Sequence, residues 1–266
     1  MLKIPVIVAL AVAAVALQAP SSKAPAGDSP LVLQLPGNVP LEMVRIPAGT
    51  FTMGSPDSEM KTDEHVGKEP LHRVTIPRPF YLSKYEVMQR QYRALTGTNP
   101  SQVQGDDLPV TNVSWEEAVA FARHASEALK RPLRLPTDAE WEYAARAGTG
   151  TMVYTGNDEA AVYAAGWCGG NGDHRMHAVG EKPPNAFGLF DMIGNVREWT
   201  QDIYGPESTG DVTDPTGPTQ GDMRISRGGA YTGRLAVCRA AIRNVEPPTK
   251  SNGIIGVRLA MDAAGR

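Results

Sequence analysis

The sequence predicts a single α+β domain with little regular secondary structure, and three observations support this. The chain has 266 residues, enough for one large domain or two small ones, and for a sizeable core without covalent staples. It contains 27 glycines and 22 prolines, which predict many turns and few long helices or strands. Helix-capping patterns are interspersed with short apolar runs that are typical of strands.

The composition is that of an ordinary globular protein. Hydrophobic residues make up 41% of the chain and charged residues 21%, and the formal net charge is −3. A chain with this charge has no basic excess that would attract nucleic acid or an anionic membrane surface. We therefore expect no nucleic acid as partner.

The chain begins with the pattern of a secretory signal peptide. Lys3 is followed by an almost continuous apolar run over 4–17 and then by small residues. We predict a signal peptide over 1–24, a flexible linker over 25–40 and a folded domain over 41–262. An uncleaved N-terminal anchor is the alternative, although the run is short for a membrane-spanning helix. The mature protein should be periplasmic or secreted, with no membrane partner after signal cleavage.

Three helices are predicted from capping patterns and apolar spacing. Ser114 and Glu117 form a capping box, and so do Thr137 and Glu140. A further helix over 88–95 should end at the glycine that follows it. The buried faces should consist of Ala118, Phe121, Ala122 and Ala125 in the helix after Ser114, and of Trp141 and Ala144 in the helix after Thr137.

Strands are expected where apolar and polar residues alternate between turn residues. These stretches are 42–55, 71–76, 80–87, 223–231 and 253–260. The segment 149–184 is glycine-rich without a clear period, and a strand could begin near its end at Val179. Many glycine, proline, aspartate and threonine residues over 201–222 predict a long surface loop.

The two cysteines of the chain, Cys168 and Cys238, leave their pairing open. In an oxidising compartment a disulfide between them is allowed, but sequence alone does not place their Cα atoms within reach. Two cysteines without a nearby histidine pair do not make a zinc site.

One stretch, 185–199, concentrates oxygen-bearing side chains in a short turn. Asp191, Asn195 and Glu198 lie around Gly194, whose lack of a side chain permits a sharp bend of the backbone. Carboxylates and carbonyls from one compact turn are typical calcium ligands. From spacing alone, a buried polar turn without metal is the alternative.

Several blocks of the sequence follow one another in a recognisable order. They are Met43 to Gly54 (MVRIPAGTFTMG), Pro109 to Trp115 (PVTNVSW), Arg134 to Arg146 (RLPTDAEWEYAAR), the Gly-Asn-x-x-Glu-Trp end of 185–199, Arg227 to Tyr231 (RGGAY) and Gly256 to Leu259 (GVRL). In this order the blocks resemble the formylglycine-generating enzyme family, also called sulfatase-modifying factors. The resemblance covers roughly 41–260. It implies one irregular α+β domain with a C-type-lectin-like fold.

The resemblance also implies a calcium ion in the turn of 185–199. Members of the family bind the ion through the first and last acidic or amide side chains of the turn and through two carbonyls between them. Carried over by position, the ligands are Asp191, Gly194, Val196 and Glu198.

Copper is not expected from the same resemblance. Aerobic enzymes of the family hold Cu(I) between two cysteines that lie five residues apart after the Gly-Gly block, and soft thiolates suit this ion. Here the two positions are Gly233 and Cys238, so one thiolate is missing. Ala230 and Arg197 also stand where the family has serine and tryptophan. These differences indicate that copper-dependent formylglycine generation is lost or replaced.

Two hypotheses for the function follow. In the first, the pocket of the family binds a peptide, ligand or partner, and the candidate contacts are Tyr231, Arg234, Arg239 and Arg243. In the second, the protein is an oxidoreductase, either a formylglycine generator or an enzyme like the periplasmic family members of siderophore maturation. Cys238 could then act as a nucleophile or redox thiol, and a small buried side chain is the alternative for this residue.

Overall fold

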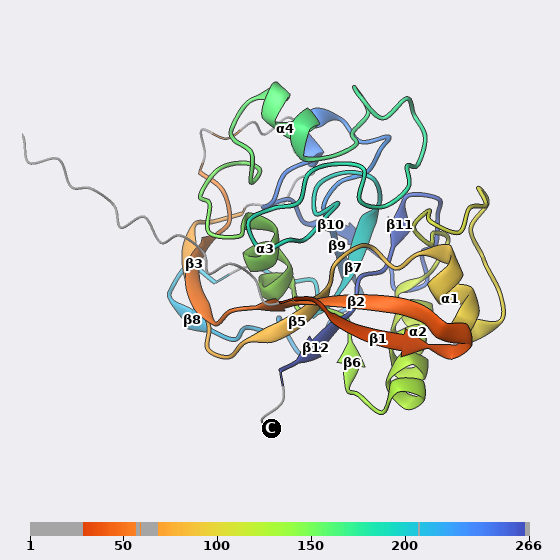
Figure 1. Ribbon diagram of the computed structural model, residues 1–266. Helices are drawn as coiled ribbons and strands as arrows, with labels where there is room; N and C mark the ends of the chain where they lie inside the picture. Colours follow the sequence, from red (N-terminus) through yellow and green to blue (C-terminus); the bar gives the residue numbers. More distant parts are fainter. Residues whose placement is uncertain (1–28, 57–58, 60–68, 207, 264–266) are drawn as a thin grey trace, which may run out of the picture.

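Short strands and helices joined by long loops make up the structure, a computed structural model that describes residues 29–56, 59, 69–206 and 208–263. Within these residues the strands form three sheets, of five, four and three strands. Loops occupy much of the chain between them (Figure 1). This arrangement confirms the predicted α+β class with short regular elements.

The five-stranded sheet brings the two ends of the folded domain together. Its strands, in spatial order, are β1 (Leu31–Leu35), β2 (Val39–Ile46), β5 (Phe80–Ser83), β12 (Ala260–Asp262) and β6 (Leu133–Arg134). Strand β12 pairs antiparallel with both β5 and β6. The N-terminal and C-terminal segments of the domain therefore share one sheet.

Strand β1 places the start of the folded domain before the predicted boundary at residue 41. It pairs antiparallel with β2 along its whole length. Leu33 and Leu35 are buried while Val32 and Gln34 are exposed, which is the alternation of a half-buried strand. The predicted flexible linker over 25–40 is therefore wrong from Leu31 onward, because leucine burial offsets the entropy lost on ordering this segment.

The other two sheets are smaller. The four-stranded sheet has the order β10 (Asn244–Glu246), β9 (Arg224–Arg227), β7 (Arg197–Ile203) and β11 (Ile255–Gly256), and the three-stranded sheet has the order β3 (Gly49–Met53), β4 (His72–Ile76) and β8 (Val212–Thr213). All five predicted strand stretches contain strand. No strand begins at Val179, and the predicted loop over 201–222 instead contains the end of β7 and all of β8.

The helices follow the predicted caps. They are α1 (Gln89–Thr96), α2 (Trp115–Leu129), α3 (Asp138–Arg146) and α4 (Glu159–Ala165). Ser114 Oγ accepts from the Glu117 N–H at 3.2 Å, and the Glu117 carboxylate accepts from the Ser114 N–H at 2.8 Å. The same reciprocal box starts α3, and Gly97 ends α1 in the left-handed region at φ 74°. Helix α4 was not predicted, because it lies in the glycine-rich segment and has one cap, Asp158.

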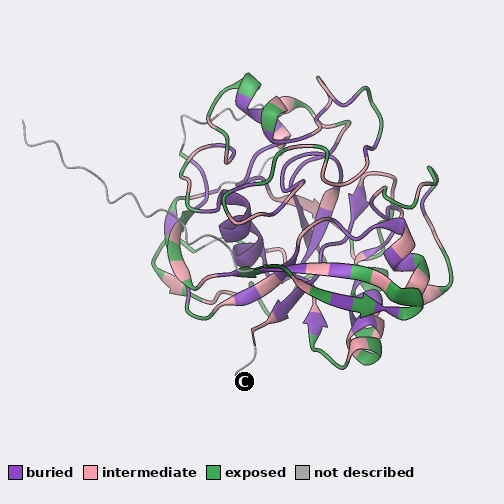
Figure 2. Cartoon of the chain, viewed as in Figure 1, coloured by how far each residue is buried: buried purple, intermediate pink, exposed green. Residues whose placement is uncertain are grey.

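Helix α3 is buried along its whole length, beyond the one apolar face that the sequence predicts. All nine of its residues are buried, as the uniform colour of the central helix shows (Figure 2). Its charged side chains are matched inside the molecule, since Glu142 pairs with Arg146 at 2.8 Å and Glu140 with Arg134 at 2.6 Å. A buried charge needs such a partner to offset its lost hydration.

The buried apolar residues form two cores, and the apolar residues of α3 belong to the first of them. One contains Trp141, Ile193 and the two cysteines, and the other contains Phe121, Trp199 and Leu259.

The predicted signal peptide over 1–24 lies outside the described residues. In the described part of the chain, no helix has the length and apolar character needed to cross a membrane.

Candidate functional site

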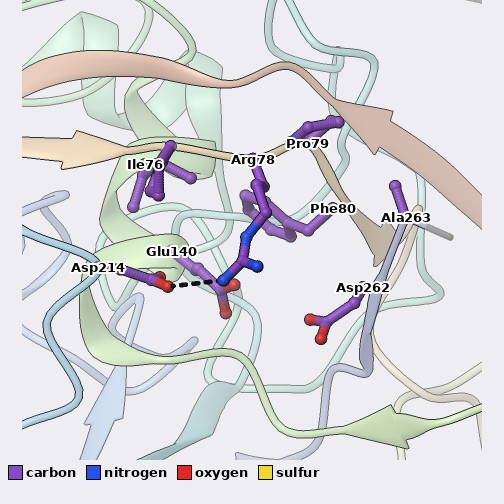
Figure 3. A pocket seen from close by; sticks show the side chains of 9 residues that line it. Ile76, Arg78, Pro79, Phe80, Glu140, Asp214, Asp262 and Ala263 are labelled. Atoms are coloured by element: carbon purple, nitrogen blue, oxygen red, sulfur yellow. Dashed lines mark ion pairs between the residues drawn. The ribbon is translucent and has the colours of Figure 1, made fainter. Parts of the chain in front are cut away.

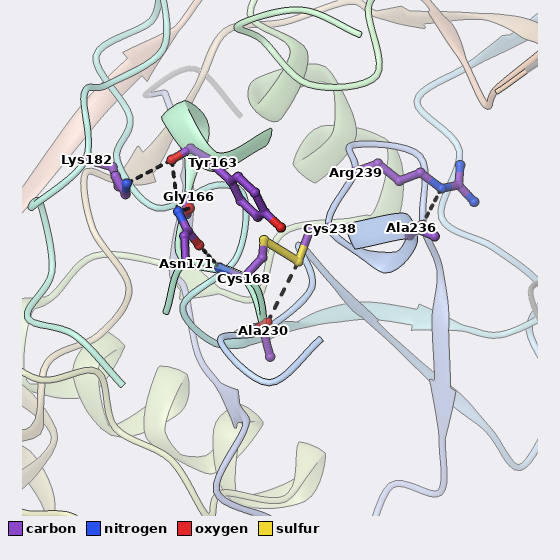
Figure 4. Close-up of a disulfide and its surroundings, with 9 residues drawn as sticks. All are labelled: Tyr163, Gly166, Cys168, Asn171, Lys182, Ala230, Ala236, Cys238 and Arg239. Carbon is purple, nitrogen blue, oxygen red and sulfur yellow. Dashed lines mark hydrogen bonds between the residues drawn. A yellow bond between two sulfur atoms is a disulfide. The ribbon is translucent and has the colours of Figure 1, made fainter. Parts of the chain in front are cut away.

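A disulfide joins Cys168 to Cys238 (Figure 4). Their Cα atoms are 6.6 Å apart, and both residues are completely buried. The chain has two cysteines in all, so neither is a free thiol in this structure. The hypothesis that Cys238 acts alone as a nucleophile is wrong for this state, because its sulfur is already bonded.

The disulfide connects two loops, 166–182 and 229–238, which we call the paired loops. The Gly169 N–H donates to the Gly233 carbonyl at 2.9 Å, so backbone contacts reinforce the covalent link. A side chain at Gly169 would meet that carbonyl, and one at Gly229 would meet Val237 and Cys238. The close approach of the two loops therefore depends on glycine at 169, and the tight fold of the loop 229–238 depends on glycine at 229.

The four predicted ligand contacts do not form one cluster: two lie on the paired loops and two are in buried ion pairs. Tyr231 and Arg234 lie on the paired loops, half-buried and exposed respectively. Arg239 is completely buried and pairs with Glu69 at 2.7 Å, so it is not a surface contact. Arg243 is largely buried and pairs with Asp138 at 2.9 Å, at the start of α3. The sequence spacing suggested one cluster, but the chain turns inward after Cys238.

An aromatic and cationic group on the paired loops was not predicted. The rings of Trp167 and His177 are stacked with their centroids 3.9 Å apart, and Lys182 Nζ lies 3.8 Å from the Trp167 centroid. Stacking and cation–π contacts of this kind fix the orientation of a side chain. Trp167 Nε1 is buried and has no hydrogen-bond acceptor among the described residues. The tryptophan next to Cys168 was the signal available in the sequence.

The predicted calcium turn has the sharp backbone that the glycine suggested. Asp191, Gly194 and Asn195 all have positive φ angles, of 56°, 76° and 53°. A side chain at Gly194 would collide with the backbone of Trp167. The Gly194 N–H donates to the Gly228 carbonyl at 2.7 Å, which ties the turn to the strand end of β9. The turn is thus held on both sides by backbone contacts.

The predicted calcium ligands fit an ion only in part. Asp191 has one carboxylate oxygen, Oδ1, that is buried and has no partner among the described residues. Both carboxylate oxygens of Glu198 already accept hydrogen bonds, because Arg258 donates to each of them at 2.7–2.9 Å and Trp141 Nε1 donates to one at 2.6 Å. Calcium prefers six to eight oxygen ligands. Among the described residues, no three acidic, histidine or cysteine side chains are arranged to hold a metal.

Three buried carboxylates, Glu86, Asp191 and Glu198, act on the buried guanidinium of Arg258, which donates hydrogen bonds to Glu198, and we call this group the enclosed cluster. Burial raises the pKa of Glu86 well above its usual value, and the nearby Asp191 carboxylate adds to this rise. Burial likewise raises the pKa of Asp191 to about 6. One guanidinium faces three carboxylates, so the cluster favours an additional proton or cation.

A small cavity of about 30 Å³ lies beside the turn between β4 and β5 (Figure 3). Arg78, Glu140, Asp214 and Asp262 line it. Arg78 and Asp214 form an ion pair at 3.7 Å, and both are substantially exposed. Glu140 is already paired with Arg134. The charges of this cavity are therefore matched locally, and exposed pairs of this kind contribute little.

Fold and site together define a single C-type-lectin-like α+β domain built around a buried ionic core. The family model described as "Sulfatase-modifying factor enzyme 1-like domain" matches residues 31–263. The chain therefore belongs to the sulfatase-modifying factor family, which confirms the resemblance found in the sequence.

Relatives and solved structures agree with this assignment. The chain is 30% identical over 291 residues to a formylglycine-generating enzyme of Bos taurus, covering 84% of this chain and 75% of the enzyme. It is also 30% identical over 288 residues to that of Streptomyces coelicolor, covering 83% and 89%. Treponema denticola variable protein 1 matches with a TM-score of 0.80 and 27% identity, covering 88% and 99%. PvdO from Pseudomonas aeruginosa matches with a TM-score of 0.74 and 29% identity, covering 89% and 100%.

Proposed function

We propose that this protein is an exported family member that uses the paired loops to bind a peptide, a protein partner or a small ligand, without copper-dependent catalysis. The observation that carries the proposal is the disulfide between its two cysteines. Cu(I) is selected by thiolates, and an oxidised pair offers none. The position five residues before Cys238 is Gly233, which supplies no ligand.

The paired loops have features that suit binding. The disulfide and the Gly169–Gly233 hydrogen bond fix one loop against the other, and a fixed loop loses less entropy when a ligand binds. Arg234 is exposed on the same loop as Tyr231. An aromatic ring and a guanidinium are the side chains that most often carry interface energy.

Calcium is the second part of the proposal. Asp191 Oδ1 would be its carboxylate ligand, with carbonyl oxygens of Gly194 and Val196 as further candidates. Glu198 would join only if it gave up a hydrogen bond to Arg258 or Trp141. The ion would supply positive charge to the enclosed cluster, where burial already favours added cation or proton.

A second candidate function, an oxidoreductase of the formylglycine-generating type, is supported by the convergence of the two sulfurs. Reduction of the disulfide would leave two thiols side by side, although only Cys238 stands at a position of the family's pair and Cys168 does not. Two adjacent thiolates are a suitable site for Cu(I). The curated relatives at 30% identity are formylglycine-generating enzymes.

One pair of measurements separates the two candidates. The protein, oxidised and separately reduced, is titrated with Cu(I) against a competing chelator, and is incubated under air with a peptide that carries a Cys-x-Pro-x-Arg motif. We expect no tight stoichiometric Cu(I) binding by the oxidised protein, and an unchanged peptide mass with either form. Conversion of the peptide cysteine to formylglycine by the copper-loaded reduced protein would contradict the binding proposal and establish the enzyme.

Peptide binding itself can be tested with the same peptide and the oxidised protein. We expect Arg234→Ala to weaken binding by about tenfold, since interface arginines often contribute more than 1 kcal/mol. Arg123→Ala is the matched control, because Arg123 is an exposed arginine on α2, away from the paired loops. Equal affinity of both variants would contradict the role of Arg234.

A further inference from the structure

A second cavity, of about 80 Å³, lies beside the start of α3 and is separate from the paired loops, none of whose residues line it. Strands β3, β4, β7 and β8 contribute to its wall, together with the chain after β7. Much of the lining is apolar and includes Met53, Ala139, Val212, Pro215 and Pro218. A cavity of this size holds a few atoms of a ligand, more than one water molecule and less than a drug-sized molecule.

One buried carboxylate in this wall forms no ion pair with any residue that the structure describes. Asp202, on β7, is 4% exposed. Its Oδ2 accepts from the Asp138 N–H at 2.8 Å. Among the described residues, no ion pair and no other hydrogen bond involve its side chain. Burial raises the pKa of Asp202 to about 7, and the neighbouring Asp138 carboxylate adds to the rise.

The cations near Asp202 make their hydrogen bonds to other groups, and Arg224, which also attracts this carboxylate, donates to the Gln201 carbonyl. Arg243 Nε donates to Asp138 Oδ2 at 2.9 Å, and its Nη1 donates to the Gly205 carbonyl at 3.0 Å. Arg227 also binds Asp138. At Asp202, the repulsion from Asp138 outweighs the attraction from Arg243, as the causes of its raised pKa show. A cation in the cavity would therefore relieve an unbalanced carboxylate.

We propose that this cavity binds a primary ammonium group at the end of a short aliphatic chain, with the Asp202 carboxylate as its counter-ion. The apolar wall suits the methylene stem, and the carboxylate oxygen left open by the Asp138 N–H suits the ammonium. The ligand is either a free alkylamine or a lysine side chain of a peptide, since both present the same group.

The first test uses n-butylammonium as the probe, with binding followed by amide NMR shifts at pH 8. We expect saturable shifts at the cavity for the wild type, and at least about tenfold weaker binding for Asp202→Asn, which removes the charge and keeps the shape. Asp214→Asn is the matched control, because Asp214 lies in the smaller cavity, and it should bind like the wild type. Neutral 1-butanol should not bind. Equal binding of butanol, or unchanged affinity in Asp202→Asn, would overturn the proposal.

The second test distinguishes the source of the amine and checks the cavity wall. A Gly-Lys-Gly peptide is compared with its Nε-acetylated form. Stronger binding of the lysine peptide than of butylammonium would assign a peptide ligand, and the reverse would assign a free amine. Val212→Phe fills the cavity from β8 and should weaken both probes by about tenfold or more. Retained binding in Val212→Phe, or equal binding of the acetylated peptide, would contradict the assigned site.

Discussion

Two groups of buried carboxylates differ in how the fold neutralises them. In the enclosed cluster, Arg258 is completely buried and donates to Glu198 and to the carbonyls of Ser83 and Phe190. In the second group, Asp138 takes the donors of two arginines while Asp202 keeps an open oxygen toward a cavity. Both groups are buried, but in the second the two arginines bind Asp138, and Asp202 accepts a hydrogen bond from a backbone N–H instead of a guanidinium.

The comparison shows that burial does not by itself distinguish a structural carboxylate from a functional one. Burial is the largest cause of the raised pKa of Glu86, of Asp191 and of Asp202 alike. What differs is whether the chain supplies the compensating positive charge from a fixed side chain or leaves a space where one can enter. A perturbed pKa points to function when it coincides with such a space.

Removal of Arg258 should have the largest effect on stability. Arg258→Met leaves three buried carboxylates without their central cation, and breaking a buried pair from one side typically costs about 3–5 kcal/mol. We expect a loss of this size in the free energy of unfolding, measured by urea denaturation at pH 8. Arg123→Met, which removes an exposed pair with Glu127, should cost at most about 0.5 kcal/mol.

A double variant checks that the effect arises from unpaired charge. Glu198→Gln added to Arg258→Met removes one carboxylate and should recover part of the lost stability, because one fewer charge is buried without a partner. If the double variant is less stable than Arg258→Met by the full cost of Glu198→Gln alone, the two residues are not coupled, and the enclosed cluster is not held together by charge.

Asp202→Asn should instead stabilise the protein at alkaline pH. The pKa of Asp202 is raised to about 7 in the folded state, so the folded state holds this proton more tightly than the unfolded state does. The stability that the proton provides is complete below the unfolded pKa and is lost as pH rises through the folded pKa. Asparagine does not titrate, so the variant does not lose stability in this way. We expect equal stability near pH 4 and a higher free energy of unfolding for the variant at pH 8, by at most about 4 kcal/mol at 1.36 kcal/mol for each pKa unit.

Urea denaturation of both proteins from pH 4 to pH 8 measures this difference directly. Asp191 and Glu86 titrate with the same sign, but they are present in both proteins and cancel in the comparison. A variant that is less stable than the wild type at pH 8 would show that the Asp202 carboxylate is already neutralised, and the second group would then resemble the enclosed cluster.

Local patterns in the sequence predicted the local structure. The capping boxes at Ser114 and Thr137 correctly predicted the starts of α2 and α3, because each box depends on two residues three positions apart. The ordered blocks correctly predicted the family and its fold. The linker prediction was wrong at β1, where the alternation of leucines with Val32 and Gln34 was a strand signal that the flanking prolines and serines obscured.

Contacts between residues far apart in the chain could not be predicted from the sequence, and the reason is physical. Cys168 and Cys238 are 70 residues apart, and only the packing of the paired loops brings them together. Arg239 was predicted as a ligand contact together with Arg234. In the structure, however, it is buried in an ion pair with Glu69, which lies 170 positions away in the sequence. The choice between a buried ion pair and a surface contact depends on such partners, which no short motif contains.

Calcium should have the smallest effect of the three changes on stability, and it tests whether Arg258 alone neutralises the enclosed cluster. An ion bound at 100 times its Kd stabilises the folded state by about 2.7 kcal/mol. We expect calcium to raise the Tm and EGTA to lower it, and we expect Asp191→Asn to abolish this response because it removes the open carboxylate. Asp214→Asn, a half-buried acidic control outside the turn of 185–199, should respond like the wild type. The same Tm with calcium and with EGTA would mean that the guanidinium, with a proton on Glu86 or Asp191, replaces the ion, and that the turn of 185–199 keeps its shape through the contacts of Gly194 alone.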